Sequence, residues 1–282
     1  MFYQSLSISK QALHQLLDRR MHQNEEKAYL LILIAQIRSD HPTLSCRAMY
    51  YKIRPKGLGR DSFERLCKEQ GFSIERKLNY YRTTDSSGVI RFDDLLKTAV
   101  LKDIDQAWSS DITYFEIKER FYYITFIMDC YSRRILGYSV SQRLTTEQTT
   151  LAALKSAVKT RRNQIPEQII FHSDGGGQYY DKEFLKYTAS YKMRNSMCEF
   201  AYENGKAERL NGIIKNNYLR FYTIETFEGL QKSVDRAVTL YNYHRPHKAL
   251  KYQCPVGYEK NIVLLQQQTK LTMTESLDAK PV

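Results

Sequence analysis

Apolar residues recur at helical spacing in the first quarter of the chain. Their pattern predicts four helices, over residues 10–20, 25–38, 45–53 and 60–70. The last two flank a segment that favours a turn, Arg54-Pro55-Lys56-Gly57-Leu58-Gly59. Two helices joined in this way suit a helix-turn-helix variant. The pattern therefore predicts a small all-α helix-turn-helix region over residues 1–82.

The pattern changes beyond residue 101, where β-branched and aromatic residues cluster or alternate with polar ones. Three successive strands are predicted, joined by short polar turns, over residues 107–115, 121–129 and 134–141. Helical and extended segments then follow in turn, over residues 146–162, 168–172, 181–189, 196–200 and 204–222. The order βββαβαβα is typical of an α/β domain, a mixed sheet flanked by helices.

A last helix is predicted over residues 226–243, before a proline-containing turn and a tail rich in Gln, Thr and Lys. The expected regions are 1–82, a linker over 83–100, a core over 101–262 and a flexible tail over 263–282. The longest apolar run, residues 28–35, is far below the roughly 20 residues of a membrane span. The amino terminus carries no secretion signal. We therefore expect a cytoplasmic protein that does not enter a membrane.

Charge points to a polyanionic partner, because 43 Lys and Arg stand against 31 Asp and Glu, a formal net charge of +12. Residues 43–83, around the predicted helix-turn-helix, hold ten Lys and Arg against four Asp and Glu. Basic helices of this kind suit double-stranded DNA. The candidate phosphate contacts are Lys52, Arg54, Lys56 and Arg60. The alternative is a solvated basic face beside a tyrosine core.

Cysteine and histidine do not indicate a metal site. The five cysteines are scattered without a Cys-x-x-Cys pair, so neither a disulfide framework nor a zinc site is expected. His244 and His247 are separated by Pro246 and lack nearby further ligands, which favours packing or DNA contact. His172 is either a packed strand residue or a group that orients a neighbouring ligand.

Three carboxylates stand where chemistry is expected. Asp111 lies inside an apolar strand, where an uncompensated charge is costly. Asp174 follows an apolar strand and precedes three glycines, which permit close approach of a ligand. Glu208 shares a helix face with Asn211 and Lys215. Singly, each carboxylate has an ordinary structural explanation. Together they could hold two divalent ions for phosphodiester chemistry, and all-oxygen ligands suit Mg²⁺.

The segments around these carboxylates resemble the three acidic motifs of DDE transposases with a retroviral-integrase core. They are Trp108-Ser109-Ser110-Asp111-Ile112-Thr113-Tyr114, His172-Ser173-Asp174-Gly175-Gly176 and Glu203-Asn204-Gly205-Lys206-Ala207-Glu208. Sixty-two residues separate the first carboxylate from the second and 33 separate the second from the third, which is similar to the family's insertion-sequence branch. Lys215 matches a basic residue that the family places beside the DNA, and residues 241–255 resemble its closing motif.

The resemblance covers about residues 101–258 and implies a ribonuclease H-like fold. It implies Asp111, Asp174 and Glu208 as catalytic and metal-binding residues, with Mg²⁺ as the ion and Mn²⁺ as a substitute. The implied activity is nicking at the ends of an insertion sequence, followed by strand transfer from the freed 3′-hydroxyl. A homo-oligomer, at least a dimer, is implied by the need to pair two DNA ends. The family also often fuses such a chain to the product of an upstream reading frame.

Two alternatives use the same residues differently. A catalytically inactive regulator that keeps the transposase fold would explain the basic charge without turnover. A tyrosine recombinase would use the cations near His244 and a tyrosine nucleophile, for which Tyr252 and Tyr258 are the candidates. The presence of all three carboxylates favours the transposase over both.

Overall fold

The computed structural model describes residues 9–74, 92–198 and 204–278, with side chains described through residue 268. The chain divides into two compact units, Met1–Glu75 and Arg76–Val282. The first half of the predicted linker, residues 83–91, lies outside the described residues. Residues 92–100 are described, and there the Leu95 N–H donates to Ser196 Oγ at 2.9 Å. Within the described part of the chain, every helix is too short or too polar to cross a membrane.

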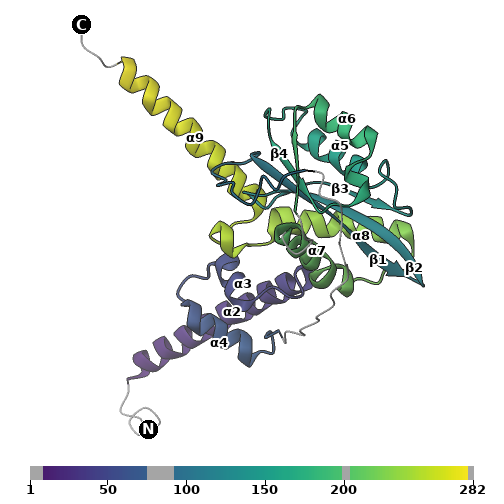
Figure 1. Cartoon of the computed structure of the whole chain (residues 1–282). Coiled ribbons are helices and arrows are strands. Elements are labelled where there is room, and N and C mark those ends of the chain that lie inside the picture. The colour runs from purple at the N-terminus through teal and green to yellow at the C-terminus, as the bar shows by residue number, and fades with distance from the viewer. Residues whose placement is uncertain (1–8, 75–91, 199–203, 279–282) are drawn as a thin grey trace. The chain divides into compact units, whose positions relative to one another are not determined.

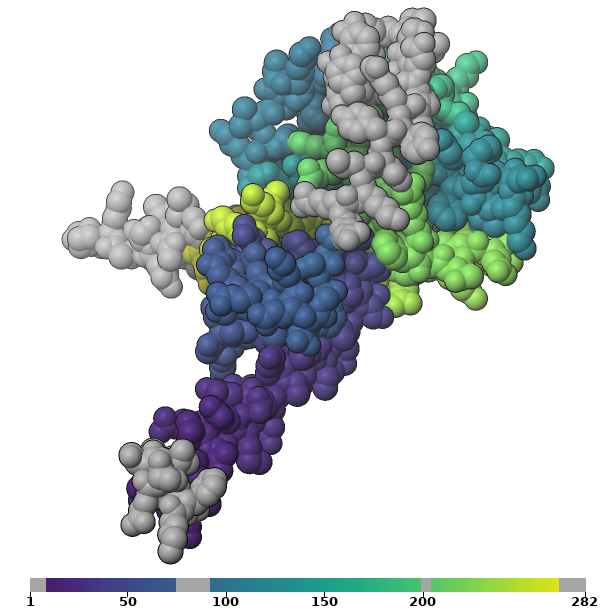
Figure 2. Space-filling view, turned by 90° about the horizontal axis from the view of Figure 1, so that it is seen from below, coloured from purple at the N-terminus to yellow at the C-terminus, as the bar shows by residue number. Residues whose placement is uncertain are grey.

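The first unit begins with one long helix, α2 (Lys10–Asp40), where the sequence predicted two. Ser9 caps it, since its side chain accepts a hydrogen bond from the backbone N–H of Ala12. The two predicted helices merge because the residues between them include neither glycine nor proline. The amino-terminal part of α2 extends beyond the other helices of this unit (Figures 1 and 2), and its buried residues, Leu30 and Ile34, lie in the second half.

Helices α3 (Cys46–Ile53) and α4 (Arg60–Glu69) follow as the sequence predicted. The chain reverses between them through Arg54, at φ 50°, and Gly57, at φ 75°. Glycine adopts that left-handed conformation without the steric penalty of other residues. The fully buried side chains of the pair, Met49, Phe63 and Cys67, form its small core. The predicted helical region is therefore present.

The second unit is built on a five-stranded sheet of order β3-β2-β1-β4-β5. Its strands are β1 (Ala107–Ile117), β2 (Arg120–Asp129), β3 (Ile135–Ser141), β4 (Ile170–Ser173) and β5 (Arg194–Met197). The first three form an antiparallel meander, and β4 and β5 run parallel to β1. Strand β5 begins two residues before the predicted segment 196–200, whose last two residues lie outside the described part.

Helices cover both faces of this sheet (Figure 1). Helices α5 (Thr150–Thr160) and α6 (Lys182–Ser190) pack on one face around Trp108, and α7 (Gly205–Asn217) and α8 (Phe227–Thr239) pack on the other. Helix α7 is shorter than predicted, because it ends at Asn217 and a 3₁₀ turn, Leu219–Phe221, follows. The mixed sheet, its strand order and its flanking helices confirm the predicted ribonuclease H-like class.

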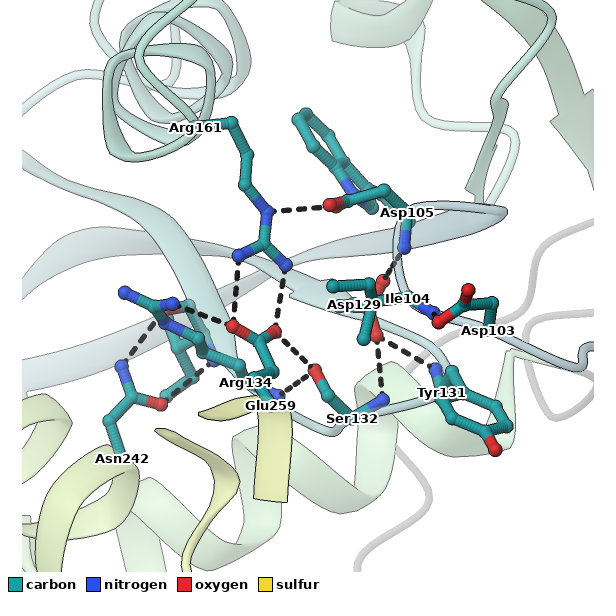
Figure 3. Close-up of polar contacts among 12 residues, drawn as sticks. Asp103, Ile104, Asp105, Asp129, Tyr131, Ser132, Arg134, Arg161, Asn242 and Glu259 are labelled. Carbon is teal, nitrogen blue, oxygen red and sulfur yellow. Dashed lines mark hydrogen bonds and ion pairs between the residues drawn. The ribbon is translucent and has the colours of Figure 1, made fainter. Parts of the chain in front are cut away.

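Helix α9 (Pro255–Asp278) ends the described chain and runs through most of the segment predicted to be a flexible tail. A group of charged residues fixes its first turn to the sheet (Figure 3). Glu259 accepts hydrogen bonds from Arg134 at 2.6 Å and from Arg161 at 2.7 and 2.9 Å. Arg161 also pairs with Asp105 at 2.9 Å. The carboxylate of one helix therefore joins a β2–β3 turn, the end of α5 and the segment before β1.

Candidate active site

Two of the three predicted carboxylates come from neighbouring parallel strands. Asp111 lies in the middle of β1, and Asp174 directly follows β4. Ser109 of β1 is in register with His172 of β4, so continuing the register by two residues aligns Asp111 with Asp174. Since neighbouring strands lie about 4.8 Å apart, the sheet itself brings these carboxylates together.

Helix α7 brings the third carboxylate to the same place. Asp111 is opposite Phe126 of β2, and Phe126 belongs to the core beneath α7 and α8, so Asp111 faces α7. Glu208 lies in the first turn of α7. Three residues later, Asn211 donates a hydrogen bond from Nδ2 to Asp111 Oδ2 at 2.7 Å. The site therefore combines two strands and one helix, as the sequence predicted.

Side chains buried beside Asp111 hold its strand in place. Asn204 stands at the amino-terminal end of α7, yet its side chain does not cap the helix. Its Nδ2 instead donates to the Ser110 carbonyl at 3.0 Å. The Ser110 hydroxyl is hydrogen-bonded to the Tyr179 hydroxyl at 2.9 Å, and both side chains are buried. The peptide Ser110-Asp111 is thus bonded by three side chains from outside its own strand.

The surroundings of the three carboxylates disfavour their ionised forms. Burial raises the pKa of Asp111 to about 8, and the charges of Asp174 and Glu208 act in the same direction. The Ile112 N–H and the Asn211 amide oppose this rise. Burial also raises the pKa of Asp174, and burial together with the Asp174 charge raises the pKa of Glu208. A cation would relieve this repulsion.

The donor chemistry suits a hard divalent cation. The three carboxylates offer oxygen only, and Mg²⁺ prefers oxygen ligands. Asn211 Oδ1, beside Asp111, is buried and has no hydrogen-bond partner within the described part of the chain. Among the described residues, no group of three His, Cys, Asp or Glu side chains is arranged to hold an ion. The three carboxylates fit a divalent cation in charge and in ligand type, but their oxygens do not surround a common point.

Lys215 lies on α7 two turns beyond Glu208. Its Nζ donates to Thr113 Oγ1 at 3.3 Å and lies 4.6 Å from the centroid of the Tyr114 ring. Burial and the charge of Arg220 lower the pKa of Lys215, whereas the charge of Asp111 raises it. The predicted DNA-contact lysine is thus within electrostatic reach of the acidic group.

The other predicted DNA contacts belong to the first unit. Lys52, Arg54, Lys56 and Arg60 are all exposed, at the end of α3, in the turn and at the start of α4. Arg60 is engaged within its own helix, since it pairs with Asp61 at 2.8 Å and lies 4.0 Å from Glu64. Arg54 donates to the Tyr51 carbonyl at 3.4 Å. The four side chains still form an exposed basic surface. The positive charge of Arg60 is partly neutralised by Asp61 and Glu64, so Arg60 should attract a phosphate less strongly than the other three.

Of the three histidines considered in the sequence, His172 and His247 pack against the fold and His244 is exposed. His172 is buried in β4, with Nδ1 3.0 Å from Ser196 Oγ and 3.8 Å from an Asp94 carboxylate oxygen. These contacts favour the packed-strand interpretation of His172. The His247 ring packs edge-on against Tyr241, with 4.7 Å between centroids.

Sequence reasoning missed two residues of the site. Tyr179 was unremarkable in the sequence, although it follows Asp174 closely in a glycine-rich loop. Asn204 is of a residue type that favours helix N-caps, yet its side chain bonds the neighbouring strand instead. Only the folded arrangement brings either side chain beside Ser110, since each is remote from it in sequence.

Comparison with known proteins gives independent evidence for the class of the second unit. Two family models match the chain, both described as Integrase core domain, over residues 104–202 and 192–255. Together they span more than half of the chain and include all three carboxylates. The fold and these matches define an integrase core domain.

The relatives are insertion-sequence proteins. The chain is 28% identical over 254 residues to the insertion element IS600 uncharacterized 31 kDa protein of Shigella sonnei, covering 88% of this chain and 91% of that protein. It is 27% identical over 229 residues to the transposase for insertion sequence element IS629 of Shigella sonnei, covering 78% and 75%. Among solved structures, the HTLV-2 integrase catalytic core domain in complex with magnesium aligns at TM-score 0.45 and 20% identity, covering 56% of this chain and 97% of that one. This chain belongs to the insertion-sequence transposases with an integrase-type core.

Proposed function

We propose that the chain is a DNA transposase that nicks the ends of its insertion sequence and performs strand transfer by metal-dependent phosphodiester chemistry. The observation that carries this proposal is the contrast between Glu259 and the three carboxylates of the acidic site. Burial alone would raise the pKa of Glu259, but Arg161 and Arg134 hold it below its usual value. At the acidic site, burial and neighbouring carboxylates raise the pKa values. Within the described part of the chain no ion pair neutralises these three carboxylates, although Lys215 lies near Asp111, and such a set is suited to binding a cation.

The residues take distinct roles in the proposed reaction. Asp111 and Asp174, from adjacent strands, would flank the bound ions, and Glu208 would complete one coordination sphere. When bound, two divalent cations would activate the attacking hydroxyl and stabilise the leaving oxygen. Mg²⁺ is the expected ion, with Mn²⁺ as a substitute. Asn211 orients Asp111 by holding one carboxylate oxygen, and Lys215 would bind a phosphate next to the cut.

The proposed partner is double-stranded DNA at the element ends and at the target. Lys52, Arg54, Lys56 and Arg60 supply exposed positive charge on a helix-turn-helix unit, which supports phosphate contact. Two ends have to be paired, so we propose at least a dimer, acting on cytoplasmic DNA. A product of an upstream reading frame, fused or separate, is a further proposed partner.

An inactive regulator with the same fold is the second candidate. It would bind DNA through the same basic helices and would not need ionisable side chains at the three acidic positions. The group of Asp111, Asp174 and Glu208 favours the enzyme, since the mutual repulsion of these carboxylates raises the pKa values of Asp111 and Glu208 and is unfavourable unless the group binds a ligand.

An excision assay in cells tests the proposal. The chain is supplied beside its native flanking DNA, with and without the upstream reading frame, and joined-end junctions are amplified. Wild type is compared with Asp174→Asn and Glu208→Gln, and with Glu225→Gln as a matched change at an exposed helix-flanking carboxylate. Immunoblotting confirms equal amounts of each protein.

Junctions that form with wild type and Glu225→Gln, and disappear with Asp174→Asn and Glu208→Gln, support the transposase. Junctions that persist in both acidic-site variants overturn the proposed chemistry. A complete lack of junctions in every arm, together with specific binding to the flanking DNA, favours the regulator. Two further arms carry Tyr252→Phe and Tyr258→Phe, and junctions lost in either of these but kept in the acidic-site variants would instead indicate a tyrosine recombinase.

A further inference from the structure

Two large aromatic side chains lie exposed at one end of the β1–β2 hairpin. Tyr114 of β1 is 42% exposed and Phe121 of β2 is 51% exposed. Their rings contact each other with centroids 5.2 Å apart and planes at 87°. Such a pair in water leaves apolar ring surface uncovered, which costs free energy unless a partner covers it.

This aromatic pair stands at an open edge of the sheet. Strand β1 pairs with β4 only over Ala107–Ser109, so among the described strands its later residues have β2 as their sole partner. Thr113 and Tyr114 point to opposite faces of the strand. Lys215 contacts both, through Thr113 Oγ1 and the Tyr114 ring, and therefore lies at that edge.

The same edge leads to the acidic site. Tyr114 is three residues from Asp111, about 10 Å along the strand or roughly three base steps of duplex DNA. Its side chain projects from the face of the sheet opposite to that of Asp111, and Lys215 at the open edge lies between the two faces. Lys215 lies close enough to Arg220 and to Asp111 for their charges to act on it. The edge thus offers cations and ring faces within a few nucleotides of the carboxylates.

Aromatic faces beside cations are the combination that binds unpaired nucleotides, because the base stacks on the ring and the cation meets the phosphate. A duplex presents its phosphates but keeps its bases stacked on each other. An edge-to-face pair presents the face of one ring, which matches a single base better than a base pair. The occupant that fits this edge is therefore an unpaired base.

We propose that Tyr114 and Phe121 form a stacking platform for an unpaired base beside the scissile phosphate, with Lys215 binding the adjoining phosphate. The inference deepens the proposed function, on which it rests, by assigning a binding site for one nucleotide of the DNA end. Separating the terminal bases would expose the strand that is cut, and the platform would hold the displaced base while the phosphate reaches the carboxylates.

Fluorescence of 2-aminopurine tests the platform without requiring catalysis. The probe is a 20-base-pair duplex with a two-nucleotide 3′ tail that carries 2-aminopurine, mixed with the full chain in low salt and EDTA. A second probe carries 2-aminopurine inside a blunt duplex of the same sequence. The variants are Tyr114→Leu, Phe121→Leu and Tyr114→Phe, with Tyr243→Leu as a matched control at an aromatic residue that is 52% exposed.

We expect wild type, Tyr114→Phe and Tyr243→Leu to quench the tail fluorescence. Tyr114→Leu should lose the quenching and bind the tailed probe about tenfold more weakly, ~1.4 kcal/mol, while the blunt duplex is bound within about twofold of wild type. Phe121→Leu should reduce the quenching in part. Circular dichroism and thermal unfolding confirm that each variant is folded.

Two results would overturn the platform: quenching that survives both leucine substitutions, or equal weakening of tailed and blunt probes by Tyr114→Leu. These are separable from failure of the proposed function, which is read from the acidic-site variants in the excision assay. Normal excision together with quenching that does not require Tyr114 would contradict the platform and leave the proposed function intact. Quenching that requires Tyr114 without any excision would support the nucleotide site and contradict the proposed reaction.

Discussion

The Tyr179 hydroxyl lies 2.9 Å from the Ser110 hydroxyl in the buried interior. Ser110 precedes Asp111 in β1, and Tyr179 ends the 3₁₀ turn Gly177–Tyr179 that follows Asp174. The hydrogen bond therefore joins the two backbone segments that carry the neighbouring carboxylates. We therefore expect this hydrogen bond to help set the distance between Asp111 and Asp174.

Removing this hydroxyl should change metal use more than stability. Tyr179→Phe keeps the packed ring and loses one hydrogen bond, which costs about 1 kcal/mol in the free energy of unfolding. We expect the Mg²⁺ concentration for half-maximal nicking to rise several-fold because the carboxylates are held less closely. Nicking of an end-containing plasmid over a Mg²⁺ series measures this, and Tyr187→Phe on α6 is the matched control. An unchanged Mg²⁺ requirement would show that the bond serves stability only.

Replacing Asp111 should stabilise the metal-free protein at neutral and higher pH. The pKa of Asp111 is raised by burial to about 8, so the folded state keeps a proton that the unfolded chain releases near pH 4. The free energy of unfolding therefore falls as pH rises through this window. Asp111→Asn, which keeps an oxygen for the Asn211 amide, should gain about 2 kcal/mol at pH 8 and nothing near pH 4.

Thermal unfolding in EDTA between pH 4 and pH 8.5 measures this gain. Glu225→Gln serves as the exposed control and should follow wild type. A Tm of Asp111→Asn equal to that of wild type at pH 8 would contradict a raised pKa. The same variant should abolish excision, so stability and activity change in opposite directions.

Glu259 should show the opposite dependence on pH. Its pKa is lowered, because the two arginines outweigh the effect of burial, so its stabilising effect is present above the usual pKa and is lost as pH falls below it. Glu259→Gln removes the carboxylate that pairs with Arg134 and leaves Arg161 with Asp105 alone, and it should cost about 3 kcal/mol at pH 7. Urea unfolding at pH 7 and pH 4 should show the difference shrinking on acidification. A constant difference would mean that packing, not charge, fixes α9.

Gly137 should tolerate no side chain. A Cβ built there would collide with the backbone of Ala153 and Ala157 on α5, at 2.8 Å from the Ala157 Cα. Because these are backbone atoms of a packed helix, Gly137→Ala should cost about 2 kcal/mol or more by forcing α5 off the sheet. Gly59→Ala, where nothing lies within 4 Å of the new Cβ, is the matched control. Equal urea midpoints for the two variants would contradict the close approach of α5 and β3.

The basic surface of the first unit should control the salt dependence of DNA binding. Each phosphate contact contributes about 0.9 to the slope of log affinity against log salt. Lys52→Ala combined with Lys56→Ala should therefore lower the slope by about 2 and weaken different DNA sequences equally. Fluorescence anisotropy between 50 mM and 200 mM salt measures both quantities. A slope equal to that of wild type would assign these lysines to the solvated basic face.

The sequence alone determined the class of fold and the three acidic positions. Alternating apolar residues fixed the first three strands, since one face of each strand must be buried, and the helical pattern placed α5, α7 and α8. Each carboxylate alone has an ordinary structural explanation. The three were predicted as a group because the segments around them resemble the acidic motifs of the DDE transposases, in the same order and with similar spacing.

Helix lengths and the surroundings of the carboxylates were decided only by the tertiary structure. The sequence predicted two helices where α2 is one. The residues between the two predicted helices have neither a strong helix propensity nor a helix-breaking residue, so the local sequence did not decide between one helix and two. The helices predicted from the sequence end at residue 243, so α9 was not anticipated, and its attachment through Glu259 to Arg161 bridges 98 positions. Tyr179, Asn204 and Lys215 reach β1 from positions far along the chain. Pairings between such distant residues leave no periodic pattern in the sequence and exist only once the sheet has assembled.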